Sequence, residues 1–196
     1  GSGEIGLTGA VVEPDSGDLL VGLVYEDEDF PTEPKPHYPR VIRLQSSDDG
    51  LEATGQSTVL DMEGETQDAS HQVSSLTITP AGDLLVHNGD GIAKPKLAQD
   101  LDRYRGKILR MTLDGEPVEG NPFYTDDDED TARDYVYAYG VRNPFGGAWR
   151  LSDGAHFMVE NGPFVDRLAK VVAGENYGWP DDFKLSHMAA YNWDPS

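Results

Sequence analysis

The sequence predicts an all-β fold, and within that class a part of a β-propeller. Two observations lead to this prediction. The chain consists of short runs with alternating or β-branched residues, each bounded by clusters of Gly, Pro, Asp and Ser. Short strands with such punctuation are typical of sandwiches, barrels and propellers. A weak internal repeat then favours the propeller among these three.

The repeat consists of an apolar run, a glycine-containing turn and a second apolar run. It is found at 11–20 and 77–85, with a degenerate copy at 148–157. The copies lie roughly 65 to 75 residues apart, more than the 40 to 50 of a simple blade, which predicts inserted loops. Each copy reads as a hairpin within one blade, so we expect about three blades of four-stranded antiparallel sheet. Three blades alone would expose strand edges. We therefore expect the rest of a ring, or a partner chain, to close the propeller.

The expected strands follow from alternation and β-branched content. In order they are 19–25, 40–44, 76–79, 84–87, 107–113, 135–139, 147–151 and 168–172, and only 97–104 has helical spacing. The segment 26–39 is acidic and proline-rich, and because proline cannot donate to a ladder we expect this segment to be a loop. The acidic run 126–130 could bind a cation, but it lacks the glycine and spacing of an EF-hand loop. A solvated loop is therefore a simpler interpretation than a cation site. No linker divides the chain, which predicts one domain over 1–196, a fragment of a longer protein.

The composition is strongly acidic. The 196 residues include 36 Asp and Glu against 15 Lys and Arg, a net charge of −21. No basic patch offsets this charge, which argues against nucleic acid and anionic membranes as partners. At molar salt the Debye length is roughly 3 Å, so salt would remove much of the self-repulsion. The composition fits a salt-adapted (halophilic) protein or an ordinary acidic secreted one. Cysteine is absent, and no run of about 18 apolar residues could span a membrane.

Three turn clusters stand close together near the end of the chain. They are the Arg-Asn-Pro of 142–144, the Glu-Asn-Gly-Pro of 160–163 and the Asn-Tyr-Gly-Trp-Pro of 176–180. Their order resembles the soluble PQQ-dependent glucose/sorbosone, or aldose sugar, dehydrogenases, which are six-bladed β-propellers that bind pyrroloquinoline quinone (PQQ) and calcium. The segments 6–15, 71–91 and 105–123 extend the resemblance upstream. It covers nearly the whole chain but only about the first half of a family member, which implies a partial six-bladed propeller.

The resemblance implies roles for individual residues. His71 corresponds to the catalytic base of the family, and Asp90 to the aspartate that orients it. One hairpin separates the two, so contact across it is plausible. Arg142 and Asn143 correspond to residues that contact PQQ. The remaining correspondences are calcium ligation by the main-chain carbonyls of Gly162 and Pro163, and a polar pocket position at Glu4.

These residue types suit the chemistry. A histidine titrates near neutrality and can accept a hydroxyl proton. A guanidinium offers a fork of donors to carboxylate or quinone oxygens, and backbone carbonyls are ligands that calcium accepts. Without the resemblance, a surface histidine in the polar run 68–72 and an arginine capping the turn before Pro144 would be the simpler interpretations. For the cluster 176–180 we expect packing that shapes the rim of the site rather than a reactive role.

Two departures from the family pattern matter. Val73-Ser74-Ser75 stands where the family often has small glycines, which could narrow the space above the cofactor. Asp166-Arg167 replaces an acidic pair, which should weaken any further calcium site there. The basic residues that later blades supply to PQQ lie outside this chain. We therefore expect this acidic segment alone to bind the anionic cofactor poorly.

The sequence thus predicts part of a PQQ- and calcium-dependent sugar dehydrogenase. Its implied partners are a sugar substrate and an external electron acceptor. Its expected location is extracellular, periplasmic or at the cell surface. A non-catalytic propeller that binds a carbohydrate or a protein at the same face is the alternative, and a purely structural extracellular module is a third possibility. Convergence of His71, Asp90, Arg142 and the Gly162 carbonyl on one cavity would favour the enzyme.

Overall fold

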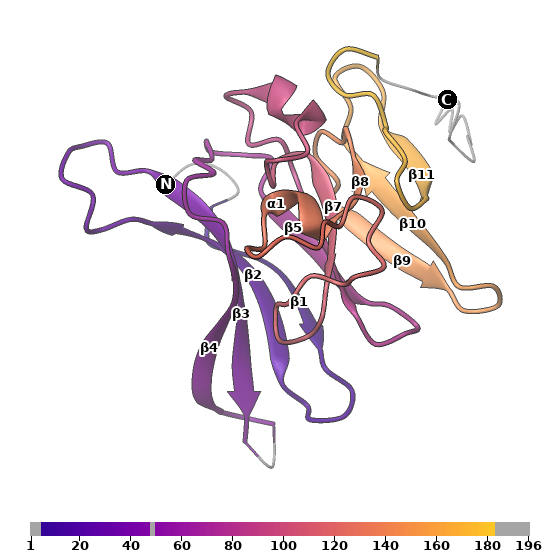
Figure 1. Ribbon diagram of the computed structural model, residues 1–196. Helices are drawn as coiled ribbons and strands as arrows, with labels where there is room; N and C mark the ends of the chain where they lie inside the picture. Colours follow the sequence, from indigo (N-terminus) through magenta and orange to yellow (C-terminus); the bar gives the residue numbers. More distant parts are fainter. Residues whose placement is uncertain (1–4, 48–49, 183–196) are drawn as a thin grey trace, which may run out of the picture.

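Three antiparallel sheets follow one another along the chain (Figure 1). The computed structural model describes residues 5–47 and 50–182. The first sheet consists of β1 (Leu7–Val12), β2 (Leu19–Glu26), β3 (His37–Ser46) and β4 (Ala53–Asp61). The second consists of β5 (Val73–Ile78), β6 (Leu84–Asn88), β7 (Lys107–Met111) and β8 (Val136–Tyr139). The third consists of β9 (Gly146–Arg150), β10 (Ala155–Glu160) and β11 (Arg167–Val171).

Each sheet is a meander in which every strand pairs with the next one in sequence. The first strands meet one another, because β1 contacts β5 and β5 contacts β9. Three consecutive meanders whose first strands lie together are the arrangement of propeller blades around an axis. Two short helical elements lie in the connections, the 3₁₀ turn η1 (Pro95–Gln99) and the one-turn helix α1 (Ala132–Tyr135).

The sheets pack face to face through two apolar clusters. The first joins the first two sheets and includes Leu20, Val41, Leu76 and Leu109. The second joins the second and third sheets and includes Met158. Glycines in the first sheet permit the close approach. A Cβ on Gly9 would overlap the Ser74 carbonyl oxygen, and a Cβ on Gly22 would lie 2.9 Å from the Leu76 side chain.

The expected fold class is confirmed, and so are the three hairpins of the repeat, which are β1–β2, β5–β6 and β9–β10. Four details differ. The third sheet has three strands within the described residues, rather than four. The helical spacing of 97–104 gives only η1, because Lys107 donates from Nζ to the carbonyls of Leu97 and Ala98. The sequence also missed β4, most of whose residues are exposed. The expected loop over 26–39 is shorter than predicted, because β2 extends to Glu26 and β3 begins at His37, so that Pro39 pairs with Val24 inside the first sheet.

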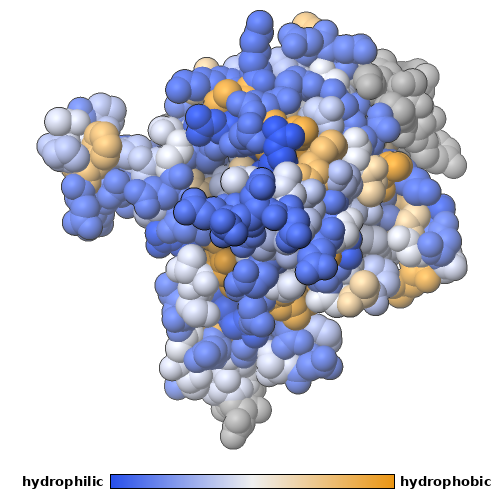
Figure 2. Space-filling view, in the orientation of Figure 1, coloured by the Kyte–Doolittle hydropathy of each residue, from blue (hydrophilic) through white to orange (hydrophobic). Residues whose placement is uncertain are grey.

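One face of the molecule is mostly hydrophilic, as the high content of charged residues leads one to expect. Hydrophilic residues cover most of the face seen in Figure 2, with apolar residues scattered among them. None of the helical elements in the described ranges has the length and apolar character needed to cross a membrane.

A buried histidine pair joins the second and third sheets. The Nε2 atoms of His87 on β6 and His156 on β10 lie 2.9 Å apart, so one ring donates and the other accepts. The indole of Trp149 lies 4.5 Å from the His156 ring. Burial, and for His87 also the neighbouring ring, lowers the pKa of His87 to about 3 and that of His156 to about 4. Both rings are therefore neutral in the folded protein near neutral pH.

This pair should make the fold acid-sensitive. The folded-state pKa values lie below the ordinary value of 6.5. The unfolded chain therefore takes up protons first, and the free energy of unfolding falls as the pH drops from about 6.5 toward 4. Each histidine contributes a slope of up to about 1.4 kcal/mol per pH unit there. We expect His87→Leu to flatten the pH dependence of urea unfolding by about this amount. An unaltered slope in His87→Leu would contradict the assignment.

Candidate functional site

The hairpin of β5 and β6 brings His71 and Asp90 together. His71 precedes β5, Asp90 follows β6, and the register pairs Val73 with Asn88 between them. Nδ1 of His71 and Oδ1 of Asp90 lie 2.6 Å apart. A carboxylate only accepts hydrogen bonds, so Nδ1 carries a proton, and in the neutral form of the ring Nε2 is the acceptor. His71 has a positive backbone φ of 62°. Residues other than glycine rarely adopt this conformation, and it is often found at functional sites.

Asp90 is almost fully buried and accepts three hydrogen bonds. Its Oδ1 also accepts from the Ile92 amide at 2.9 Å, and its Oδ2 accepts from the indole Nε1 of Trp179 at 2.6 Å. Its own amide donates to the Arg142 carbonyl at 2.8 Å. The carboxylate is therefore held by its own loop and by the third turn cluster, and its backbone is tied to the first.

The Arg-Asn-Pro turn lies beside this pair. The Arg142 guanidinium donates to the Asn161 carbonyl at 3.0 Å and lies 5.4 Å from the centre of the Trp179 ring. The Asn143 carbonyl accepts from the Asn161 amide at 3.0 Å. The Asn143 side chain is buried, and its Oδ1 has no hydrogen-bond partner among the described residues. A buried amide oxygen without a partner is costly and indicates a missing polar partner.

The Gly-Pro turn connects β10 and β11. Gly162 is half-buried and Pro163 exposed, and no described residue donates a backbone hydrogen bond to either carbonyl. The carbonyls are thus available, but no group of three acidic or histidine side chains suited to a metal occurs among the described residues. Glu4 lies outside the described residues.

A fully buried ion pair joins all three turn clusters. Nε of Arg167 on β11 donates to Oε2 of Glu160 on β10 at 2.6 Å, and both side chains are 0% exposed. The other Glu160 oxygen accepts from the Arg142 amide, and Arg167 donates to the Tyr177 carbonyl at 2.8 Å. Burial raises the pKa of Glu160, and the Arg167 charge counteracts that rise.

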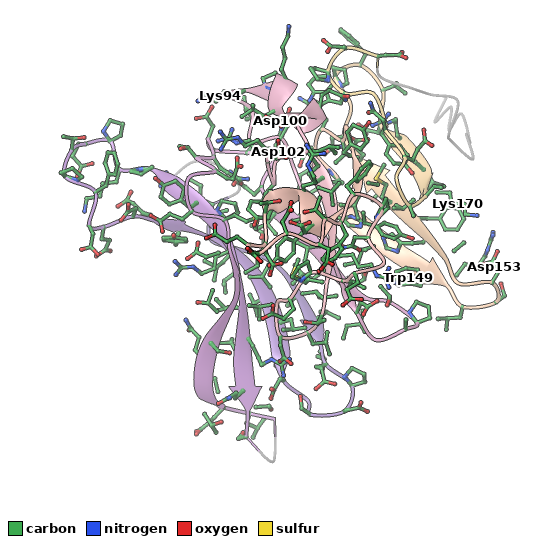
Figure 3. The ribbon with its side chains drawn as sticks, in the orientation of Figure 1. Lys94, Asp100, Asp102, Trp149, Asp153 and Lys170 are labelled. Carbon is green, nitrogen blue, oxygen red and sulfur yellow. The ribbon has the colours of Figure 1, made fainter. Side chains whose placement is uncertain are left out.

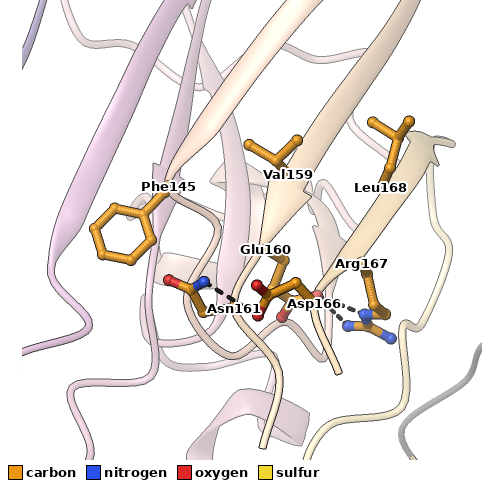
Figure 4. A pocket seen from close by; sticks show the side chains of 7 residues that line it. All are labelled: Phe145, Val159, Glu160, Asn161, Asp166, Arg167 and Leu168. Atoms are coloured by element: carbon orange, nitrogen blue, oxygen red, sulfur yellow. Dashed lines mark hydrogen bonds and ion pairs between the residues drawn. The ribbon is translucent and has the colours of Figure 1, made fainter. Parts of the chain in front are cut away.

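A cavity of about 330 Å³ opens beside this ion pair (Figure 4). Val159, Leu168 and Phe145 form its apolar side, and Asn161 donates to Asp166 at 3.2 Å on its polar side. His71, Asp90, Arg142 and Gly162 do not line this cavity, so the convergence on one cavity that would favour the enzyme is not found here. The structure therefore joins His71, Asp90 and Arg142 through hydrogen bonds and shared neighbours rather than around one measured hollow.

Sequence reasoning missed the roles of three residues of this network. Trp179 belongs to a cluster that the sequence assigns to packing at the rim, whereas its indole bonds Asp90. Glu160 opens a recognised turn cluster, but nothing in its spacing reveals its partner. Arg167 is a departure from the family pattern, and the structure places its charge in the pair with Glu160.

The fold and the site together define a β-propeller segment with a histidine–aspartate pair and an arginine at its loops. The chain belongs to the glucose/sorbosone dehydrogenase family, whose model matches residues 1–193. It is 35% identical over 135 residues to the aldose sugar dehydrogenase YliI of Escherichia coli, covering 68% of this chain and 35% of that protein. It is 36% identical over 84 residues to quinoprotein glucose dehydrogenase B of Acinetobacter calcoaceticus, covering 42% of this chain and 16% of that protein.

A solved structure of an aldose sugar dehydrogenase has a similar fold. The PQQ-bound aldose sugar dehydrogenase from Streptomyces coelicolor superimposes with a TM-score of 0.76 at 29% identity, over 97% of this chain and 53% of that one. The chain thus spans about half of this solved structure and about a third of the aldose sugar dehydrogenase YliI.

Because the Glu160–Arg167 ion pair is buried, we expect substitutions of its two members to have non-additive effects on the free energy of unfolding. Arg167→Leu leaves the Glu160 carboxylate buried without its partner, and the expected cost is about 3–5 kcal/mol of unfolding free energy. The double variant Glu160→Leu, Arg167→Leu should lose less than the sum of the two single variants, as urea unfolding would measure. Arg150→Leu, which breaks the exposed pair with Asp153, is the control and should change stability little. Additive single effects would contradict a coupled pair.

Proposed function

We propose that this chain is the part of a PQQ- and calcium-dependent sugar dehydrogenase that carries its catalytic base and one wall of its cofactor site. The observation that carries the proposal is the contact of His71 with a buried Asp90 that also binds the backbone of Arg142. A relative is named a quinoprotein, and a solved neighbour is described as PQQ-bound.

The residues present fit the anionic quinone. Asn143 offers a buried side chain whose oxygen has no partner among the described residues. A flip of the amide would present donors in place of that oxygen. Arg142 supplies a guanidinium beside it, suited to carboxylate or quinone oxygens. We propose that these two side chains hold PQQ and that the carbonyls of Gly162 and Pro163 hold calcium, which accepts backbone oxygen ligands.

PQQ, when bound, supplies the acceptor for the hydride that leaves the sugar C1. The protein supplies the base. Nε2 of His71 carries the lone pair, because Nδ1 donates to Asp90. It takes the proton of the C1 hydroxyl, and the Asp90 carboxylate stabilises the imidazolium that forms. The Arg142 charge stabilises negative charge that develops next to it.

The charge of the chain sets conditions for this activity. A net charge of −21 repels an anionic cofactor. We propose that the remaining blades contribute further cations, that an external acceptor reoxidises the cofactor, and that the protein works outside the cytoplasm. Salt screens the repulsion, so assays belong at high salt.

The test follows dye reduction with a panel of aldoses, using the complete protein with PQQ and calcium at high salt. We expect activity that requires both additions and that falls about 10²- to 10⁴-fold in His71→Ala. The control is His37→Ala, since His37 is a partly exposed residue of β3 paired with Glu26, and it should retain activity. Absence of PQQ binding in the complete protein would refute the enzyme and leave the non-catalytic propeller.

A further inference from the structure

Trp179 contacts both Asp90, the partner of His71, and Arg142, a proposed PQQ-binding residue. The edge of its indole donates from Nε1 to Oδ2 of Asp90 at 2.6 Å, and its face lies 5.4 Å from the Arg142 guanidinium carbon. We infer that Trp179 is a positioning residue that fixes the plane of the Asp90 carboxylate and thereby the orientation of the His71 ring. This inference rests on the proposed function for its catalytic consequence, but not for its structural content.

The two oxygens of Asp90 have separate tasks. Oδ1 accepts from His71 at 2.6 Å and from the Ile92 amide at 2.9 Å. Oδ2 accepts from Trp179. Without the indole donor, the carboxylate could rotate about its terminal torsion, which is soft in aspartate. The hydrogen bond to Nδ1 would then lose its fixed direction, and the protonated nitrogen of His71 would no longer be specified.

Trp179 is itself held firmly. Its amide donates to the Gly140 carbonyl at 2.9 Å, and its carbonyl accepts from Nε2 of Gln99 at 2.6 Å. The side-chain amides of Gln99 and Asn176 exchange two hydrogen bonds, at 3.0 and 2.7 Å. A rigid support of this kind is what a positioning group requires.

The support extends into the second sheet. Gln99 ends η1, and Nζ of the buried Lys107 on β7 donates to the Leu97 and Ala98 carbonyls within η1 at 3.1 and 3.0 Å. Burial lowers the pKa of Lys107 to about 7. The indole is therefore braced from the second sheet while it bonds the aspartate that orients the base.

The test is Trp179→Phe, which keeps an aromatic face toward Arg142 and removes the N–H. Trp149→Phe is the matched control, because its indole donates to Thr77 Oγ1 at 3.1 Å. Trp149 lies on the third sheet, away from the loop that carries Asp100 and Asp102 (Figure 3). In the complete enzyme with PQQ and calcium, we expect Trp179→Phe to lower kcat about 10-fold or more, the effect of one lost bond to a charged group, with KM little changed. Trp149→Phe should leave kcat unchanged.

A second readout does not need activity. The ring-nitrogen NMR signals of His71, identified with His71→Gln, should show a single tautomer with Nδ1 protonated in the wild-type chain. Trp179→Phe should give mixed tautomers and Asp90→Asn should also lose the single Nδ1-protonated form, while Trp149→Phe should keep it. If phenylalanine disturbs folding, benzothienylalanine at position 179 removes the N–H at nearly constant shape.

The outcomes distinguish the positioning role of Trp179 from the proposed dehydrogenase activity. Wild-type His71 signals in a folded Trp179 variant would overturn the inference, whatever the activity. Altered signals together with an inactive wild-type protein would uphold the positioning role and reject the dehydrogenase.

Discussion

The buried ion pair of Glu160 and Arg167 is the constraint on which the site depends. Removing two charges from water is costly, and the cost is recovered only when the remaining donors and acceptors are also satisfied. Here those additional bonds are made by the loops. The Arg142 amide donates to Glu160, and the Tyr177 carbonyl accepts from Arg167. The pair can therefore be buried only when the β10–β11 hairpin and two separate turn clusters have reached their native positions.

A series of hydrogen bonds connects this ion pair to His71, the proposed base. Tyr177 is bonded to Arg167, and two residues later Trp179 reaches Asp90. Asp90 in turn holds His71 through a 2.6 Å hydrogen bond. Each step is a hydrogen bond between two of these residues, so the orientation of the imidazole is tied to the packing of the third sheet against the second. The cost of this arrangement includes the positive φ of His71, which the surrounding contacts must offset.

Much of this architecture could be predicted from the sequence, because it is local. Alternation and turn residues predict the hairpins, and the single hairpin between His71 and Asp90 indicates that the two can meet across it, as the structure shows. The contacts that complete the site could not be predicted in this way. Trp179 meets Asp90 across 89 positions of sequence, and Arg167 lies in a pair that no local pattern indicates. The polar strand β4 was missed because most of its side chains are exposed and its alternation is therefore weak.

The most direct test of the account is a crystal structure of the complete protein with PQQ and calcium bound. The account predicts that the cofactor contacts the side chains of Arg142 and Asn143 and that calcium contacts the carbonyl of Gly162, while the hydrogen bond of His71 to Asp90 is kept. A cofactor bound elsewhere, with the Asn143 side chain still buried and without a partner, would contradict the central claim that these loops form one preorganised site.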